Sequence, residues 1–210
     1  MVSRILFICH GNICRSPMGE MIMKQLVRER HLENRFTIAS CATSREEIDN
    51  PVYPPARAEL ARHGIPCERR GARQLTRRDY EDYDLLICMD SMNVRNALRI
   101  LGSDPDDKLH KLKEYLGSAD DVADPWYNDR FDIAYAEIDA GCRALLEQIL
   151  SSGDCVSLKT LAVNGSDFPT LEGRQVGQML HRLLLHVLEH PQDNDKQRLL
   201  AIAAQAEQTD

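Results

Sequence analysis

The chain has 210 residues, of which 43% are hydrophobic and 28% are charged, and its formal net charge is −7 at pH 7. This balance excludes a wholly disordered or fibrous chain, and the acidic charge argues against a broad surface for nucleic acid or anionic membranes. The apolar run at residues 5–9 is too short for a signal-peptide core, and no later run approaches the ~18 apolar residues of a membrane span. Seven scattered cysteines fit reduced thiols better than a disulfide framework. We therefore expect a cytoplasmic protein without a membrane partner.

Segments of strand and helix character alternate along the first 150 residues. Arg4–Cys9 reads RILFIC and predicts a strand; a Gly/Asn loop follows, and Ser16 and Pro17 suit the N-cap and first position of a helix. The later segments are predicted as a strand at Phe36–Ala39, helices at Pro55–His63 and Thr76–Asp82, a strand at Leu85–Cys88, and helices at Met92–Leu101 and Asp132–Leu150. This alternation predicts an α/β fold in which helices cover a parallel sheet.

Small residues at 151–153 interrupt the pattern, and the remainder of the chain reads as helix. We place a domain boundary there, which gives one domain at residues 1–150 and a small all-helical module at 151–210. Gly173–His190 has a strong apolar stripe at helical spacing. We expect this stripe to pack on the first domain, on other helices of the module or on another chain.

The most informative motif is Cys9-His10-Gly11-Asn12-Ile13-Cys14-Arg15-Ser16, in which five residues separate a cysteine from an arginine. The loop follows a strand and leads into a helix N-terminus, where unpaired N–H groups and the helix dipole attract an anion. The same field favours a thiolate, which is the nucleophilic form of cysteine. Gly11 and Asn12 tolerate unusual backbone angles, and Arg15 can hold two phosphoryl oxygens. The motif predicts a phosphate-binding loop with Cys9 as nucleophile; the alternative is a buried cysteine that packs as a small hydrophobic residue.

Two other cysteines need separate interpretations. Cys67 and Arg73 repeat the spacing, but Cys67 follows a Gly-Ile-Pro turn and no helix begins after Arg73, so we interpret this match as accidental. Cys14 either forms a reversible disulfide with Cys9 or packs in the loop, and the sequence leaves both alternatives open.

Asp124 is the candidate general acid. If the leaving group at phosphorus is a phenolic oxygen, whose pKa is about 10, its displacement requires a proton. Asp124 lies in ADPWY, where the proline stiffens the loop and Trp126 and Tyr127 can form a wall for an aromatic substrate. The same carboxylate would then take a proton from the water that attacks the phosphocysteine. The alternative, a loop aspartate that caps the following helix, suits the neighbouring acidic residues better.

CHGNICRSP and ADPWY together resemble the low-molecular-weight protein tyrosine phosphatase family. NPVYPPARAEL, RHGIP and DLLICMDSMN extend the resemblance over about residues 1–150. It implies a four-stranded parallel sheet with flanking helices and phosphotyrosine hydrolysis through a cysteinyl-phosphate, without a cofactor or metal. It also implies that Cys9 is the nucleophile, Arg15 the phosphate clamp and Asp124 the acid and then the base.

The family pattern assigns surrounding residues as well. The expected substrate-binding residues are His10, Gly11, Asn12, Ile13, Cys14, Ser16, Trp126 and Tyr127. Among them, Asn12 would hold the loop and Ser16 would hydrogen-bond the thiolate, while Asp90 and Ser40 would belong to a supporting polar network. Arg70 stands where the family often has a histidine, so the support for Ser16 and Asp90 is expected to differ.

Related proteins with this loop include phosphoarginine phosphatases and arsenate reductases. Phosphoarginine-selective members carry threonine where this chain has Ile13, and the aromatic pair favours a phenyl ring. Arsenate reduction would need later cysteines near the pocket, whereas Cys88 lies in a strand-like run. We therefore expect tyrosine-phosphorylated proteins as substrates, and the alternative outside catalysis is a phosphate-loop binding module recruited through the helical tail.

The tail segment SLKTLAVNGSDFPTLEGRQVGQMLHRLLLHVLEHPQDNDKQRLL resembles the C-terminal helical segment of bacterial CCA-adding tRNA nucleotidyltransferases. The resemblance implies a tRNA-related or protein partner. From Ser151 onward the chain has five Lys and Arg against eight Asp and Glu, which argues against strong binding of a phosphate backbone and leaves an interaction or dimerisation module equally open. His186 and His190 lie one helical turn apart without an evident third ligand, so we expect no metal site.

Overall fold

The computed structural model describes residues 3–151, 161–169, 171, 173–189 and 193–207. The chain divides into two compact units, the first ending at Leu146 and the second beginning at Glu147. The elements in chain order are β1 (Ser3–Cys9), α1 (Arg15–Glu29), η1 (Glu33–Arg35), β2 (Phe36–Ala42), α2 (Pro54–Arg62), α3 (Arg77–Asp82), β3 (Leu85–Cys88), α4 (Ser91–Leu101), β4 (Leu109–Lys111), η2 (Leu112–Leu116), α5 (Phe131–Ser151), η3 (Gly165–Asp167), α6 (Arg174–Glu189) and α7 (Lys196–Glu207). None of the helices in the described part of the chain is long and apolar enough to cross a membrane.

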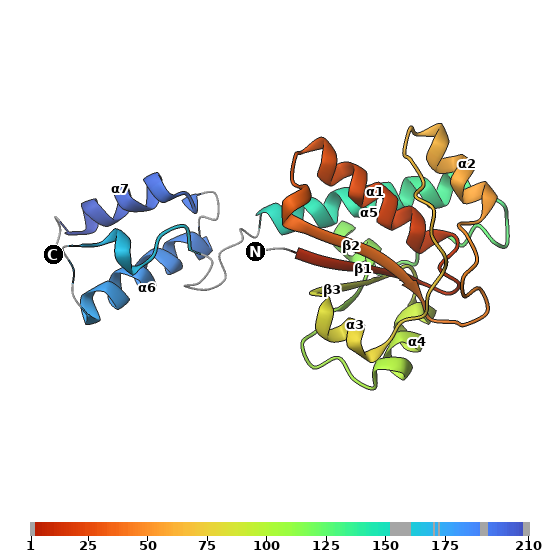
Figure 1. Ribbon diagram of the computed structural model, residues 1–210, viewed down its shortest axis with the longest axis horizontal. Coiled ribbons are helices and arrows are strands. Elements are labelled where there is room, and N and C mark those ends of the chain that lie inside the picture. Colours follow the sequence, from red (N-terminus) through yellow and green to blue (C-terminus); the bar gives the residue numbers. More distant parts are fainter. Residues whose placement is uncertain (1–2, 152–160, 170, 172, 190–192, 208–210) are drawn as a thin grey trace. The chain divides into compact units, whose positions relative to one another are not determined.

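The sheet of the first unit has four parallel strands in the order β2-β1-β3-β4 (Figure 1). β1 pairs with β2 along its whole length, up to Cys9 opposite Ala42, and with β3 up to Ile8 opposite Cys88. The four-stranded parallel sheet is thus confirmed. The residue pattern did not reveal β4, because its three residues form too short a run to show a period and only Leu109 is buried.

Helices cover both faces of this sheet: α1 and α5 lie over one face, and α3 and α4 over the other (Figure 1). Because both faces are buried, the two central strands β1 and β3 read as nearly continuous apolar runs rather than as alternating patterns. Leu6 and Ile8 of β1, for example, share one buried cluster with Leu86 of β3 and Ala97 of α4. On α5, Gly141 lies so close to η2 that an added Cβ would meet Leu112 Cγ at 2.6 Å, so this helix can approach only with glycine there.

The first helix begins differently from the sequence prediction. Cys14 occupies the N-cap position without a side-chain capping hydrogen bond, and α1 starts at Arg15. Ser16 is therefore not the N-cap, because its hydroxyl is hydrogen-bonded to the Cys9 thiol instead. Pro17 still falls in the first turn, where a missing N–H leaves no intrahelical bond unmade.

The carboxyl ends of the strands place several polar residues at one edge of the sheet. Cys9 ends β1, and Asp90 follows β3 as the N-cap of α4, accepting a hydrogen bond from the Asn93 N–H at 2.6 Å. The strand order changes direction at β1, since β2 lies on one side of it and β3 on the other. Open α/β sheets bind ligands in the crevice at such a switch point.

The second unit, in its described residues, is helical and has its own buried cluster. Met179, Leu183 and Val187 follow one another at intervals of one helical turn on α6, and they pack with Leu199 and Ala203 of α7. The cluster also includes Leu161, Val163 and Phe168. The stripe thus packs on other helices of its own unit. Of the range predicted as one helix, His190 lies outside the described residues.

Candidate active site

The predicted phosphate loop runs from Cys9 to the first turn of α1. The Cys9 thiol is buried and lies 3.0 Å from Ser16 Oγ, and it accepts a hydrogen bond from the Asn12 backbone N–H at 3.2 Å. Asn12 has a positive φ of 59°, a conformation that Asn tolerates better than most residues. A backbone N–H and a serine hydroxyl thus both contact the sulfur, an environment that suits a thiolate.

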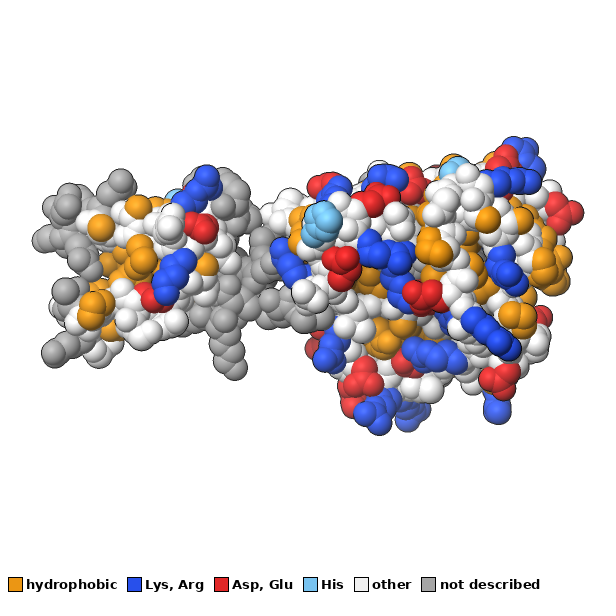
Figure 2. Space-filling view, turned by 45° about the horizontal axis from the view of Figure 1, so that its top comes forward, with side chains coloured by type: hydrophobic (Ala, Val, Ile, Leu, Met, Phe, Trp, Pro, Cys, Tyr) orange, Lys and Arg blue, Asp and Glu red, His pale blue; other side chains and the backbone are white. Residues whose placement is uncertain are grey.

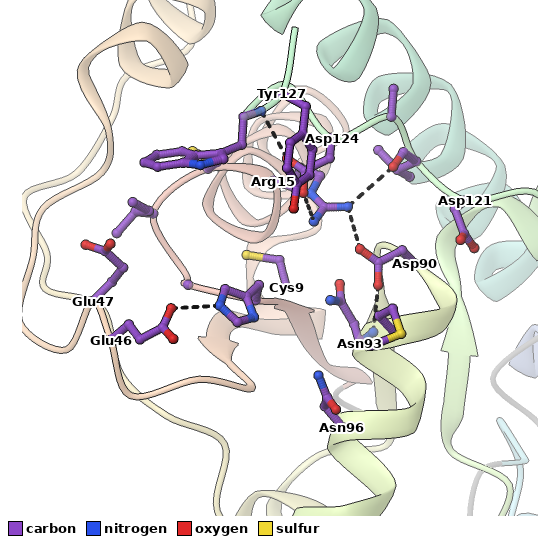
Figure 3. Close-up of a pocket in the computed structure, with 18 residues that line it drawn as sticks. Cys9, Arg15, Glu46, Glu47, Asp90, Asn93, Asn96, Asp121, Asp124 and Tyr127 are labelled. Carbon is purple, nitrogen blue, oxygen red and sulfur yellow. Dashed lines mark hydrogen bonds and ion pairs between the residues drawn. The ribbon is translucent and has the colours of Figure 1, made fainter. Parts of the chain in front are cut away.

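Arg15 joins the loop to the segment after β3, which carries Asp90, and to the loop between η2 and α5, which carries Asp124. Its Nη1 donates to Asp90 Oδ2 and its Nη2 to Asp124 Oδ2, each at 2.7 Å (Figure 3). Although burial disfavours its charge, the neighbouring negative groups Cys9, Asp124 and Asp90 raise the pKa of Arg15 above its usual value. Arg15 is therefore a permanent cation whose orientation is fixed by two carboxylates.

Asp124 lies at the mouth of the same pocket. Its Oδ1 accepts the backbone N–H of Trp126 at 3.1 Å, and its other oxygen pairs with Arg15. Trp126 is 57% exposed and packs on Tyr53, with ring centroids 5.5 Å apart, while Tyr127 is 86% exposed. Tyr53 also donates its backbone N–H to the Ile13 carbonyl at 2.8 Å. Tyr53, which directly precedes α2, therefore supports both the loop and the aromatic wall.

These side chains line a pocket of about 740 Å³. Glu46 and Glu47 stand at one side of it, where Glu46 Oε2 lies 2.9 Å from His10 Nε2 (Figure 3). The pocket-lining residues are Cys9, His10, Gly11, Ile13, Cys14, Arg15, Glu46, Glu47, Asp90, Met92, Asn93, Asn96, Asp121, Val122, Ala123, Asp124, Trp126 and Tyr127. Asn12, Ser16 and Ser40 are not among them.

Instead, these three residues belong to a buried polar network beneath the loop. Asn12 Nδ2 donates to Ser16 Oγ at 2.9 Å and to Ser40 Oγ at 2.8 Å. Ser40 Oγ in turn donates to Glu20 Oε2 at 2.6 Å. Arg70 completes the network: its guanidinium donates to Asn12 Oδ1 at 2.5 Å and pairs with the Glu20 carboxylate. The Arg70 guanidinium thus supports the loop asparagine directly.

The cysteines other than Cys9 differ from it in their surroundings. Burial, followed by the charges of Cys9 and Asp124, raises the pKa of Cys14 to about 12, so Cys14 is a neutral thiol at physiological pH. Burial also raises the pKa of the Cys41, Cys88 and Cys142 thiols. Cys9 and Cys14 are free thiols here, and the two alternatives for Cys14, a reversible disulfide with Cys9 or packing in the loop, both stay open. Cys155 lies outside the described residues.

Three side chains predicted from the sequence lie together in the structure, but several residues that hold them were not predicted. The structure brings Cys9, Arg15 and Asp124 together, with Asp90 against Arg15 and Ser40 against Asn12. Glu20 was missed, although a glutamate one helical turn after Ser16 on a helix against the sheet was a signal of a buried polar contact. Tyr53, which supports the aromatic wall, had no comparable signal.

The remaining candidates do not form a second site. Arg73 is engaged by Asp79 through two hydrogen bonds, at 2.9 and 3.0 Å, and no strand or helix holds Cys67. His186 Nε2 lies 2.9 Å from Asp193, and His190 is outside the described residues. Among the side chains that the structure describes, no group of three His, Cys, Asp or Glu could hold a metal ion.

Comparison with known proteins gives consistent matches. The family described as low molecular weight phosphotyrosine protein phosphatase matches residues 4–154. The human low molecular weight phosphotyrosine protein phosphatase is 38% identical over 152 residues, covering 69% of this chain and 94% of that protein. YfkJ of Bacillus subtilis, a low molecular weight protein-tyrosine-phosphatase, is 34% identical over 147 residues, covering 69% of this chain and 94% of its own length. Its crystal structure aligns with a TM-score of 0.69 over 71% of this chain and 96% of that one. The structure of a Drosophila arginine phosphatase aligns with a TM-score of 0.64 at 26% identity, over 69% of this chain and 96% of that chain.

Proposed function

Since the chain belongs to the low molecular weight phosphotyrosine protein phosphatase family, we propose that it hydrolyses phosphotyrosine in proteins through a phosphocysteine formed on Cys9. One observation carries this proposal: a buried thiol, a fixed arginine and a loop carboxylate meet in one pocket. Phosphoryl transfer needs a nucleophile, a cation for the transferring oxygens and a proton for the leaving group. These three side chains supply one of each.

In the first step, the substrate phosphate binds between the loop amides and Arg15. Its oxygens compete with the carboxylates for the guanidinium, and this competition releases Asp124 from its 2.7 Å ion pair. The Cys9 sulfur attacks phosphorus, and the phosphorus–oxygen bond to tyrosine breaks. Once released from Arg15, the Asp124 carboxylate takes up a proton from solvent and gives it to the departing phenolic oxygen, so the products of this step are tyrosine and a cysteinyl-phosphate.

In the second step, water hydrolyses the cysteinyl-phosphate. The Asp124 carboxylate takes a proton from the water as its oxygen bonds to phosphorus, and the sulfur–phosphorus bond breaks. Cys9 leaves as a thiolate, which Ser16 Oγ at 3.0 Å and the Asn12 N–H at 3.2 Å are placed to stabilise. Inorganic phosphate is released, and Asp124 is protonated again for the next cycle.

The pocket walls support a substrate preference. Trp126 and Tyr127 offer flat surfaces to a phenyl ring, and Ile13 adds an apolar contact at the loop. On the face that Figure 2 shows, acidic and basic side chains of the first unit are interspersed. Among the described residues that line the pocket, by contrast, Arg15 is the only lysine or arginine, whereas Glu46, Glu47 and Asp121 are acidic. We therefore propose phosphotyrosine flanked by basic residues as the preferred substrate.

The direct test measures turnover of matched phosphotyrosine and phosphoarginine peptides with EDTA present. We expect a higher kcat/KM for phosphotyrosine, and a further rise when the flanking residues change from acidic to basic. A preference for phosphoarginine would keep the cysteine chemistry but overturn the inference from Ile13 and the aromatic wall. Tight phosphopeptide binding without turnover would favour the binding-module alternative.

We further propose that residues 151–210 form a separate helical module that binds a protein or a tRNA-related partner. The support is the cluster around Leu183 and Leu199, which belongs entirely to the second unit. Since the pocket-lining residues all precede residue 128, truncation after Ser151 is expected to leave kcat/KM for phosphotyrosine within about twofold of that of the full chain. Loss of activity in a truncated chain with an intact circular dichroism spectrum would contradict this independence.

A further inference from the structure

The loop that carries Asp124 has no regular structure of its own. Residues 118–124, which we name the acid loop, form neither helix nor strand between η2 and α5. A general acid must nevertheless stay within hydrogen-bond reach of the leaving oxygen, and a misplacement of about 1 Å can lower the rate about 10²-fold. The position of Asp124 therefore depends on what fixes the acid loop from outside.

Glu137 of α5 holds the loop next to the catalytic carboxylate. Its Oε2 accepts the backbone N–H of Ala123, the residue before Asp124, at 2.7 Å. Its Oε1 accepts from Lys113 Nζ at 3.0 Å, and both side chains are largely withdrawn from solvent, with 28% and 15% exposed. Lys113 thus fixes the carboxylate that fixes the loop.

A second ion pair holds the start of the acid loop. Lys111 Nζ donates to Asp121 Oδ1 at 2.9 Å and also to the Ala119 carbonyl. Asp121 Oδ1 further accepts the backbone N–H of Ser91 at 3.0 Å and its hydroxyl at 2.8 Å. Although burial opposes the shift, the hydrogen bonds from Lys111 and Ser91 lower the pKa of Asp121 below its usual value. Because Ser91 follows Asp90, this contact ties the acid loop to the segment that orients Arg15.

We propose that these four residues, Lys111, Lys113, Asp121 and Glu137, act as an acid-loop clasp that positions Asp124 for proton transfer. Glu137 is its main positioning residue, because its hydrogen bond is to the residue directly before Asp124. None of the four needs to touch the reacting atoms, since each acts through the backbone or through another member of the clasp. The inference rests on the proposed role of Asp124 as general acid.

The test compares two substrates whose leaving groups need a proton to different extents. Glu137→Ala is expected to lower kcat/KM for a phosphotyrosine peptide by about 10–100-fold, and to lower it much less for 4-nitrophenyl phosphate, whose leaving group departs without full protonation. Glu137→Gln keeps an oxygen that can accept the Ala123 N–H, so it should restore most of the phosphotyrosine activity. A purely structural defect would lower kcat/KM equally for both substrates.

Asp139→Ala is the matched control. Asp139 lies on the same helix with a similarly shielded side chain, 23% exposed, and pairs with Arg143 on α5 rather than with the acid loop. Its replacement should leave the ratio of the two kcat/KM values unchanged. Lys113→Met provides a second test should Glu137→Ala fail to fold. This substitution removes the cation that holds Glu137 but keeps the Glu137 carboxylate, and we expect the same selective loss as in Glu137→Ala.

The outcomes separate this inference from the function on which it rests. A selective loss in Asp124→Ala but an equal loss for both substrates in Glu137→Ala and Lys113→Met would overturn the clasp and leave the phosphatase assignment intact. Absence of turnover in the wild-type protein would overturn the proposed function itself. A selective loss in all three variants, with Glu137→Gln close to wild type, is the result that the clasp predicts.

Discussion

Cys9→Ser is expected to abolish phosphotyrosine turnover, with kcat lowered by at least about 10⁴-fold, as is typical when a covalent nucleophile is lost. A serine hydroxyl remains protonated in the place where the thiolate must attack, and the loop offers it no general base during the first step. The substitution is nearly isosteric at a buried position and leaves Arg15 and the loop amides in place. Steady-state kinetics with a phosphotyrosine peptide measures the loss, and isothermal titration with inorganic phosphate tests whether binding persists.

Cys67→Ser provides the control for that result. Cys67 has the same spacing to an arginine, but it lies outside the pocket-lining residues. Its replacement should leave kcat and KM unchanged. Residual turnover in Cys9→Ser within about tenfold of wild type would show that the nucleophile is another group.

Asp124→Asn is expected to lower kcat/KM for phosphotyrosine by about 10²–10⁴-fold, the usual contribution of a positioned general acid. Asparagine keeps the shape and an oxygen for the Trp126 N–H but cannot donate a carboxylic acid proton. The loss should be smaller for 4-nitrophenyl phosphate, because its leaving group requires less protonation. The ratio of kcat/KM for the two substrates measures this difference.

Asp129→Asn serves as the comparison variant, since Asp129 is exposed and has a positive φ of 55° that asparagine also tolerates. It should resemble the wild-type protein with both substrates. Were Asp124→Asn to slow both substrates equally, Asp124 would have a structural role instead of donating the proton.

Local sequence patterns were enough to predict the loop and the alternation of strands and helices, whereas the number of strands came from the family resemblance, because the pattern did not reveal β4. The residues from Cys9 to Arg15 are neighbours in the chain. The number of residues between the cysteine and the arginine, directly after a strand, therefore determines most of the loop's geometry. The helix start was misjudged by one residue at Ser16, because a side-chain hydroxyl can either cap a helix or contact a thiol, and the tertiary contact with Cys9 decided between them. The sequence alone does not distinguish these two roles of a serine.

Local patterns could not predict the supporting contacts, because these join residues distant in the chain, and only the family resemblance pointed to Asp90 and Ser40. Arg70 reaches Asn12 across 58 positions, and a partly buried arginine there is acceptable only because Glu20 balances its charge. The clasp has the same character: Ala123 and Glu137 are 14 positions apart, and although Ala123 lies in ADPWY, that motif gives no sign of a contact with Glu137. Such pairs depend on how the helices pack, which periodicity does not determine.

The most direct test of the central claim is to trap the covalent intermediate. The protein would be mixed with a phosphotyrosine peptide in the presence of EDTA, quenched in acid during turnover and analysed by peptide mass spectrometry. We predict one phosphoryl group on the peptide that contains Cys9, on the sulfur of that residue, and none in Cys9→Ser. Turnover with no phosphorylated peptide, or with the phosphoryl group on a different residue, would contradict the account.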